Sequence, residues 1–297
     1  MNTADAALPA APDADVTARV ARLFVYPVKS CAGVEVSEAA LAPEGLDLDR
    51  AWMVVDAEGR FITQRTHPRL ALVRPQIKRL EVVLRAPGML ALHLGQNEVD
   101  TPLRVRVWGD EVQAWSMGGV AAQWFSDFLG QPGLQLARFD PEVTRLASPK
   151  WTGELQAPVA FSDGFPLLVI SQASLDGLNE RLAAAGHAPV GMARFRPNLV
   201  IDGVQAHDED RLNDLRVATA EGEVVLRLVK PCTRCPMPNV NPDTGESSPE
   251  VLAALSTYRA DARMGGALTF GMNAVIVQGE GAMLRVGDGV GADWRFD

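Results

Sequence analysis

The segment Lys230-Pro-Cys232-Thr-Arg234-Cys235-Pro-Met-Pro-Asn-Val-Asn-Pro-Asp-Thr-Gly245 carries more chemical information than any other in this chain of 297 residues. It follows an apolar run at residues 224–229 that is typical of a strand, and it is rich in Pro, Asp and Gly, which favour turns. A pair of cysteines separated by two residues therefore stands where a predicted strand ends. The interpretation of the whole chain depends on this pair.

Several kinds of site are compatible with the cysteine pair. A structural zinc site needs four ligands, and only Cys31 and the histidines, none of them at ligand spacing, remain to complete it. A thioredoxin-like dithiol normally opens a helix, which Pro236 and Pro238 disfavour. A single thiolate beside Arg234 is suited to a soft metal. Inert buried cysteines fit the spacing as well.

A second segment is Ala193-Arg194-Phe-Arg196-Pro-Asn198-Leu-Val-Ile201. In an extended chain Arg194 and Arg196 point to one face, and the proline keeps Arg196 out of helical geometry. An arginine and an asparagine at the start of an apolar strand can hold a phosphate or a polar heterocycle. Solvated arginines on an edge strand explain the pattern equally well.

A third segment is Tyr26-Pro-Val-Lys29-Ser30-Cys31-Ala-Gly33, which follows an alternating apolar run at residues 19–27. An ammonium, a hydroxyl and nearby backbone N–H groups can form a phosphate-binding corner. The segment is not a Walker A loop, because the glycine spacing of that motif is absent. A surface turn is the alternative.

Composition limits the class of protein. The chain is 47% hydrophobic and 22% charged, which suits one large domain or two medium ones. A net charge of −9 argues against duplex nucleic acid as the main partner, but it allows a local basic pocket. The apolar runs are too short to span a membrane, and the N-terminus lacks the features of an export signal. We therefore expect a cytoplasmic protein with reduced thiols and no membrane partner.

The pattern of elements predicts a mixed α/β fold that is predominantly β. Short alternating runs separated by turns fill the first half, including a hairpin over residues 51–64. Helices are expected at 120–129, at 171–185 and from Ser248. Residues 1–16 resemble a disordered tail, and a soft boundary near 140 divides residues 17–140 from 141–297. Trp108, Trp115 and Trp124 are interpreted as core or barrel residues.

Four short segments in this order resemble the MOSC superfamily, which is named after the C-terminal domain of molybdenum cofactor sulfurase. They are Tyr-Pro-Val-Lys-Ser at 26–30, Asp49-Arg50 before Trp52, Arg-Phe-Arg-Pro-Asn-Leu-Val at 194–200, and Lys-Pro-Cys-Thr-Arg-Cys at 230–235 with the later Asp-Thr-Gly. The chain looks most like the mitochondrial amidoxime-reducing component and its bacterial homologues. The resemblance implies a MOSC β-barrel core with an N-terminal β-barrel-like domain and a few helices.

The resemblance also implies a site. Cys235 becomes the metal ligand of a molybdenum–molybdopterin cofactor, and Asp163 lies on the substrate side as a second catalytic residue. Arg234 beside Cys235 is expected to favour the thiolate, while Cys31 and Cys232 are expected not to be ligands. The residues implied to hold the cofactor are Lys29, Ser30, Arg50, Arg196, Asn198, Thr233, Arg234 and Asn273.

The activity implied is the two-electron reduction of N-hydroxylated compounds such as hydroxylamines and amidoximes. Electrons must come from a separate ferredoxin, flavodoxin or cytochrome-type partner with its reductase, because no cysteine follows Cys235 to hold an iron–sulfur cluster. Pro236 and Pro238 depart from the family pattern, which leaves the choice of substrate open. The alternatives are a cofactor or sulfur carrier of the MOSC type and a structural zinc-bound β-rich binding protein.

Overall fold

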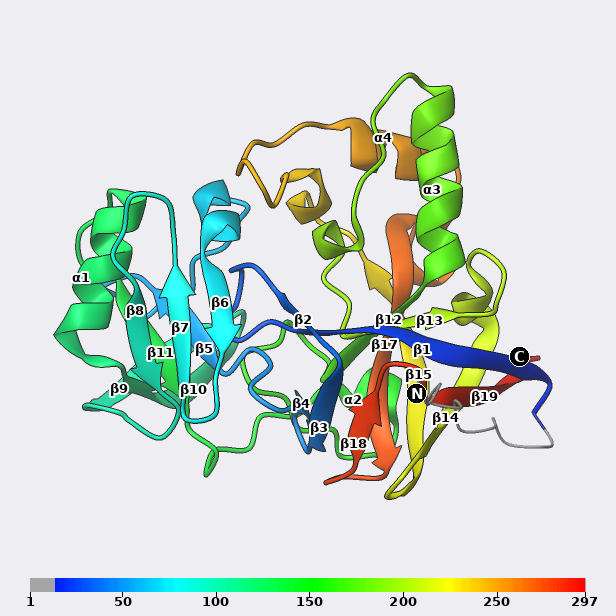
Figure 1. Cartoon of the computed structure of the whole chain (residues 1–297), viewed down its shortest axis with the longest axis horizontal. Helices are drawn as coiled ribbons and strands as arrows, with labels where there is room; N and C mark the ends of the chain where they lie inside the picture. Colours follow the sequence, from blue (N-terminus) through cyan, green and yellow to red (C-terminus); the bar gives the residue numbers. More distant parts are fainter. Residues whose placement is uncertain (1–13, 297) are drawn as a thin grey trace, which may run out of the picture.

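A closed β-barrel is the largest element of the computed structural model, which describes residues 14–296 (Figure 1). Within these residues seven strands follow one another round the barrel, and β17 closes it by pairing with β12. In barrel order they are β12 (Leu167–Ser171), β13 (Leu199–Asp202), β1 (Val16–Val25), β19 (Gly289–Trp294), β14 (Leu212–Thr219), β15 (Gly222–Thr233) and β17 (Ala267–Gln278). The predicted mixed, mainly β fold with a barrel core is confirmed.

The remaining strands extend the barrel or form small sheets beside it. The strands that pair onto the barrel are β2 (Val34–Val36) and β16 (Ala260–Asp261). The small sheets contain β3 (Glu38–Ala42), β4 (Gly45–Leu46) and β18 (Met283–Arg285); β6 (Arg74–Ile77), β7 (Glu81–Arg85) and β8 (Leu92–Gly95); and β5 (Trp52–Val55), β9 (Pro102–Val107), β10 (Asp110–Ser116) and β11 (Gln135–Phe139).

The helices are short and peripheral. The α-helices are α1 (Gly118–Leu129), α2 (Pro149–Thr152), α3 (Gln172–Ala184) and α4 (Glu250–Ser256). The 3-10 helices are η1 (Pro68–Leu72), η2 (Met192–Arg194), η3 (Asp208–Arg211), η4 (Met237–Asn239) and η5 (Ala262–Met264). In the described part of the chain, none of the helices has both the length and the apolar character needed to cross a membrane.

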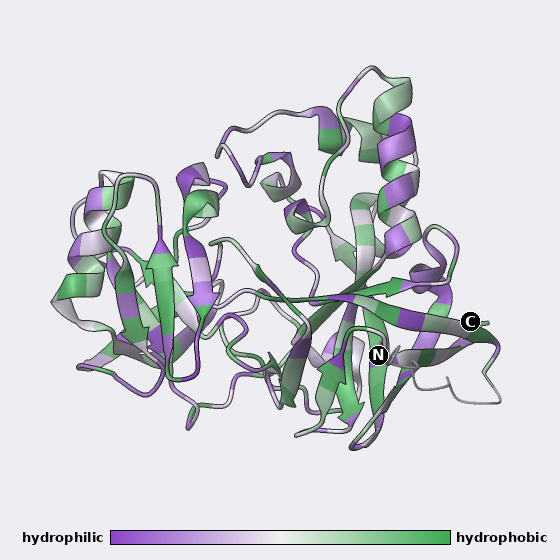
Figure 2. Cartoon of the chain, viewed as in Figure 1, coloured by the Kyte–Doolittle hydropathy of each residue, from purple (hydrophilic) through white to green (hydrophobic). Residues whose placement is uncertain are grey.

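The helices at 120–129 and 171–185 are found close to their predicted positions. Gly130, with φ 67°, ends α1, as the sequence suggested. The side chain of Ser171 accepts a hydrogen bond from the backbone N–H of Ser174 and so caps α3. The apolar face of α3 packs onto the barrel wall with β13 and Phe270. Figure 2 shows hydrophobic residues along the barrel strands and hydrophilic residues interspersed along α3.

The N-terminal half contributes to both lobes seen in Figure 1. Strand β1 pairs with β13 and β19, so this early segment completes a barrel built mainly by later strands. The sheets β5–β11–β10–β9 and β6–β7–β8 form the other lobe with α1, around a core that includes Trp52, Leu84 and Phe125. The division of the chain at residue 140 stays a prediction. The predicted tail lies outside the described residues as far as residue 13, and β1 already begins at Val16.

The predicted hairpin over residues 51–64 forms, but its second strand is shorter than predicted. The turn forms, because Asp56 accepts the backbone N–H of Gly59 and donates to the carbonyl of Arg60. Phe61 pairs with Val55, and the backbone N–H of Ile62 donates to the carbonyl of Val54 at 3.0 Å. Beyond Ile62 the chain leaves the sheet, and β5 also pairs with the distant strand β11. Residues 63–67 form a tight turn, and Arg65 in this turn lines the cavity described below. Local alternation predicted the nearby partner but could not reveal the distant one.

Barrel closure brings β17 unusually close to β12 at Gly271. This glycine has φ +78°, and a Cβ built on it would lie 2.5 Å from Ile170 Cγ1 and 2.7 Å from the carbonyl oxygen of Val169. Only glycine fits both the left-handed backbone and this approach. A side chain at residue 271 would push apart the strands that close the barrel.

We therefore expect Gly271→Ala to lower the free energy of unfolding by about 3 kcal/mol, which is the sum of backbone strain and overpacking. Urea unfolding monitored by circular dichroism measures this loss. The matched control is Gly186→Ala, because Gly186 has φ +79° but no atom within 4 Å of a built Cβ. The control should lose only about 1 kcal/mol. Equal losses in the two variants would show that the close approach is not a constraint.

Candidate cofactor and active site

Neighbouring strands bring the predicted site residues to one end of the barrel. Lys230 on β15 pairs with Asn273 on β17, and Asn273 also lies opposite Leu168 on β12. The amide oxygen of Asn198 accepts the backbone N–H of Leu168 at 3.2 Å, and its carbonyl accepts that of Phe24 at 2.9 Å. These residues lie side by side on adjacent barrel strands. The loops that follow them therefore meet at the same end of the barrel.

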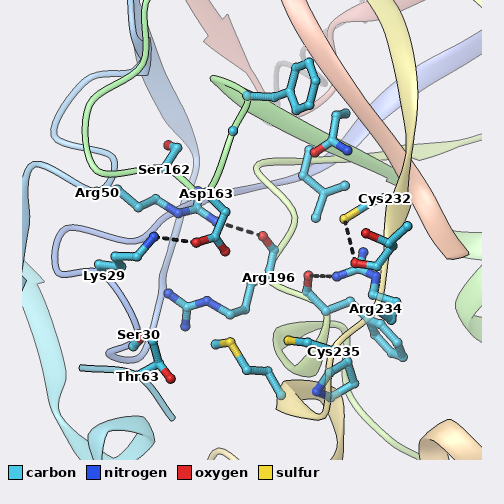
Figure 3. Close-up of a pocket in the computed structure, with 18 of the residues that line it drawn as sticks. Lys29, Ser30, Arg50, Thr63, Ser162, Asp163, Arg196, Cys232, Arg234 and Cys235 are labelled. Atoms are coloured by element: carbon cyan, nitrogen blue, oxygen red, sulfur yellow. Dashed lines mark hydrogen bonds and ion pairs between the residues drawn. The ribbon is translucent and has the colours of Figure 1, made fainter. Parts of the chain in front are cut away.

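These loops enclose a cavity of about 520 Å³ (Figure 3). All the residues predicted for the site line it: Lys29, Ser30, Arg50, Asp163, Arg196, Asn198, Thr233, Arg234, Cys235 and Asn273. Figure 3 shows Lys29 and Ser30 on one side, Cys235 on the other, and the Arg196 guanidinium between them. The structure brings the residues together, while their individual roles stay predictions.

Other residues in the cavity wall were not predicted. They include Thr63, Arg65, Trp108, Lys230 and Met237. The interpretation of Trp108 as a core residue is wrong, because its side chain is 48% exposed and faces the cavity. Trp108 occupies the turn between β9 and β10 with φ +54°, a conformation that is uncommon for tryptophan. Its place directly before Gly109-Asp110 was the one available signal that it lies in a turn.

The cavity has a large excess of positive charge. Its lining contains seven basic side chains and one carboxylate, a surplus of six within a protein of net charge −9. Only Lys29 and Arg50 form ion pairs, with Asp163 and Asp49. Within residues 14–296 no carboxylate pairs with the five other cations, which are Arg65, Arg194, Arg196, Lys230 and Arg234. An anionic ligand would compensate this charge.

The arginines at the centre are held by an aromatic ring and by fixed acceptors. The guanidinium groups of Arg50 and Arg196 lie 4.4 and 4.3 Å from the centroid of the Tyr26 ring. Arg50 also donates to Asp49, to the amide oxygen of Asn198 at 3.0 Å and to the carbonyl of Arg196 at 3.1 Å. Arg196 donates to the carbonyl of Cys31. Burial, helped by the charge of Arg50, lowers the pKa of Arg196 to about 10, so it remains a cation at neutral pH.

Lys29 and Asp163 form an ion pair in the wall of the cavity. The buried Lys29 ammonium donates to Asp163 Oδ1 at 2.6 Å and to the carbonyl of Phe161 at 2.7 Å. The indole N–H of Trp108 donates to the same carboxylate oxygen at 3.1 Å. Burial alone would raise the pKa of Asp163, but the Lys29 charge and these hydrogen bonds outweigh it and lower the pKa to about 2. Asp163 is therefore ionised at neutral pH.

The cysteines occupy different positions. Cys31 is fully buried, and burial raises its thiol pKa to about 12. Cys232 and Cys235 are partly exposed and both line the cavity. The Arg234 guanidinium donates to the carbonyls of Phe195 and Phe270, and among the described residues it makes no hydrogen bond to Cys235. It shapes the wall beside Cys235, and its bonds do not support the thiolate-stabilising role expected for it.

A zinc-type ligand set is not found in the described range. Within residues 14–296 no three His, Cys, Asp or Glu side chains are grouped so that they could hold a metal ion. A Cys-x-x-Cys pair needs two further ligands to bind zinc, and in that range no such side chains complete a group with the pair. A single sulfur ligand remains compatible with the geometry of the cavity.

Comparison with known proteins decides the family. Residues 17–132 match the model of the MOSC N-terminal beta barrel domain, and residues 156–291 match that of the MOSC domain. Mitochondrial amidoxime-reducing component 1 of Mus musculus is 38% identical over 249 residues, which cover 81% of this chain and 71% of that protein. This chain belongs to the MOSC family.

Other MOSC relatives show a graded similarity. Mitochondrial amidoxime reducing component 2 of Homo sapiens is 35% identical over 81% of this chain and 72% of its own length. Molybdenum cofactor sulfurase of Bos taurus is 28% identical over 84% of this chain but only 30% of that much longer protein. The resemblance derived from the four sequence segments is thus confirmed at the level of the family.

The pKa of Asp163 in this MOSC protein predicts how pH affects its stability. Folding lowers the pKa from 3.8 to about 2, so the stabilisation is complete above about pH 4 and is lost as the pH falls toward 2. We expect Asp163→Asn to be less stable than the natural protein by about 1 kcal/mol, discounted because the Asp163 side chain is 67% exposed in the cavity.

Urea unfolding of both proteins between pH 8 and pH 3 measures this difference. It should stay constant from pH 8 to about pH 4 and shrink below that. A difference that already shrinks between pH 8 and pH 5 would mean that Asp163 titrates near neutrality and is available as a proton donor, contrary to its contacts.

Proposed function

We propose that this MOSC protein is a molybdenum cofactor-dependent oxidoreductase that reduces N-hydroxylated compounds. The observation that carries the proposal is a cavity in which a cysteine thiol, Cys235, faces an excess of unpaired cations. A thiolate is a suitable ligand for a soft metal, and the cations suit an anionic pterin phosphate. The similarity to amidoxime-reducing components supports the substrate class.

The residues present fit such a cofactor. Cys235 would hold the metal, and Arg196, which has no carboxylate partner among the described residues, would hold an anionic group. Ser30, Asn198, Thr233 and Asn273 add polar contacts around the same cavity. When bound, a molybdenum–pterin group supplies two-electron redox chemistry of the kind that converts an N–OH group, with two electrons and two protons, into N–H and water.

The chain's own residues bind, orient and neutralise. Arg50 is fixed by Asp49, Asn198 and the Tyr26 ring, so its charge is already positioned before a ligand enters. Lys29 and Trp108 hold the carboxylate of Asp163 in its ionised form. Asp163 is therefore suited to position a hydrogen-bond donor of the substrate and unsuited to donate a proton at neutral pH.

The electron donor and the location of the protein belong to the proposal. In this proposal a separate ferredoxin, flavodoxin or cytochrome-type protein would deliver the electrons. We place the protein in the cytoplasm, where its three free cysteines would stay reduced.

A second candidate function is a cofactor or sulfur carrier. Cys232 lines the same cavity as Cys235, so two thiols are available for sulfur handling, and the chain is also similar to molybdenum cofactor sulfurase. This function predicts transfer of molybdopterin to a separate apo-enzyme without turnover of hydroxylamines. The two functions therefore differ in their products.

We expect Cys235→Ser to reduce bound molybdenum at least about tenfold and to abolish reduction of benzamidoxime, because it removes the metal's thiolate ligand. Elemental analysis of protein from a host that makes ample molybdopterin, together with an assay of benzamidine formation, measures both effects. Cys232→Ser is the matched control and should keep both properties. Full reductase activity in Cys235→Ser would refute this mechanism, whereas molybdopterin transfer without reduction would favour the carrier.

A further inference from the structure

The outer oxygen of Asp163 is a free acceptor inside the cavity. Oδ1 receives both Lys29 Nζ and Trp108 Nε1, whereas Oδ2 accepts no hydrogen bond from any residue of the described range. The side chain is 67% exposed, although Lys29 behind it is almost completely buried. The carboxylate is thus anchored at one oxygen and open at the other.

The surroundings of this oxygen favour a planar ligand. The Trp108 ring lies beside the carboxylate, and the Arg65 guanidinium lies 4.7 Å from the ring centroid. Lys230, Arg196 and Arg50 make the rest of the cavity cationic, so Asp163 is the one acidic side chain in its lining. A positively charged or N–H-rich group that enters would therefore find one suitable acceptor, at a fixed position.

We propose that Asp163 and Trp108 form a subsite for the N–C–N donor edge of a planar amidine-like group. This inference rests on the proposed function and specifies which part of a ligand the site recognises. Such an edge occurs in two ligands of that function: the amino group next to the N–OH of an amidoxime, and the 2-amino-4-oxo ring of the pterin. Asp163 accepts from the donor edge, and Trp108 holds the carboxylate at the required angle.

Trp108 is a positioning residue in this subsite. Its left-handed backbone, φ +54°, aims the indole N–H at Asp163 from the turn between β9 and β10. Phe61 packs edge-on against the ring with centroids 5.1 Å apart, which keeps the indole in place. Trp108→Phe keeps the ring area and removes the N–H, so it should weaken binding of the donor edge only a few-fold.

Direct binding tests the subsite without relying on activity. Isothermal titration calorimetry with benzamidine, benzamide and free pterin is applied to the natural protein, Asp163→Asn and Asp163→Glu. Bound molybdenum and pterin are quantified in each preparation. We expect benzamidine to bind about 10- to 100-fold more weakly to Asp163→Asn, and benzamide to change much less, because only the positively charged amidinium forms an ion pair with the carboxylate.

Two variants control for folding and for charge. Asp163→Glu keeps the ion pair possible and should show a smaller loss than Asp163→Asn, so the test survives if the latter folds poorly. Asp202→Asn removes a carboxylate paired with Arg19 at 2.7 Å outside the cavity and should bind benzamidine like the natural protein.

The outcomes distinguish the two ligands that could bind at this subsite, the amidoxime substrate and the pterin ring of the cofactor. Weaker benzamidine binding with unchanged cofactor content assigns the edge to the substrate. Loss of bound pterin and of free-pterin binding, with benzamidine unaffected, assigns it to the cofactor ring. If neither benzamidine binding nor pterin binding changes in Asp163→Asn, the proposed subsite is wrong. A natural protein without molybdenum that still binds benzamidine through Asp163 would refute the proposed function and leave the subsite standing.

Discussion

The pairing of β17 with β12 is the constraint on which the rest of the structure depends. It turns an open sheet into a barrel, and it requires Gly271, because the backbone of Val169 and the side chain of Ile170 leave no space for a Cβ. Closure also fixes the register of Asn273 against both Leu168 and Lys230. The loops of the site that leave the barrel start at this level, and the turns that carry Arg65 and Trp108 come from the other lobe. A shift of one residue would turn these side chains to the opposite face of the sheet.

The site concentrates positive charge in an acidic protein, and the fold contains that charge by specific means. Tyr26 provides an aromatic surface for Arg50 and Arg196, and backbone carbonyls accept from Arg194 and Arg234. Carbonyls satisfy the N–H donors without cancelling the charge, unlike carboxylates. The cations are thus ordered while their charge stays available to a ligand. A cavity neutralised by carboxylates would not attract a phosphate.

The sequence predicted most of the site and part of the fold, for reasons that particular residues make clear. Cys235, Arg196 and Lys29 stand in contiguous segments whose chemistry can be recognised locally, and the barrel places those segments together. The pairing of Lys29 with Asp163 could not be predicted, because 134 residues separate them. The pairing of β5 with β11 was missed for the same reason, because β11 is distant in the sequence. Trp108 was misassigned because hydrophobicity alone does not distinguish a core tryptophan from one in a cavity wall.

Backbone strain is unevenly distributed, and its location bears on how the site works. Among residues 14–296, the non-glycine residues with positive φ are Ser30, Leu48, Arg50, Trp108, Arg196 and His207. All but Leu48 and His207 line the cavity. Each such residue costs on the order of 1 kcal/mol, and it persists only where surrounding contacts determine it. Here those contacts are the ion pair of Arg50 with Asp49 and the bond from Arg196 to Cys31. The fold thus spends stability to hold cations and an indole in position before a ligand arrives, which lowers the cost of ordering them on binding.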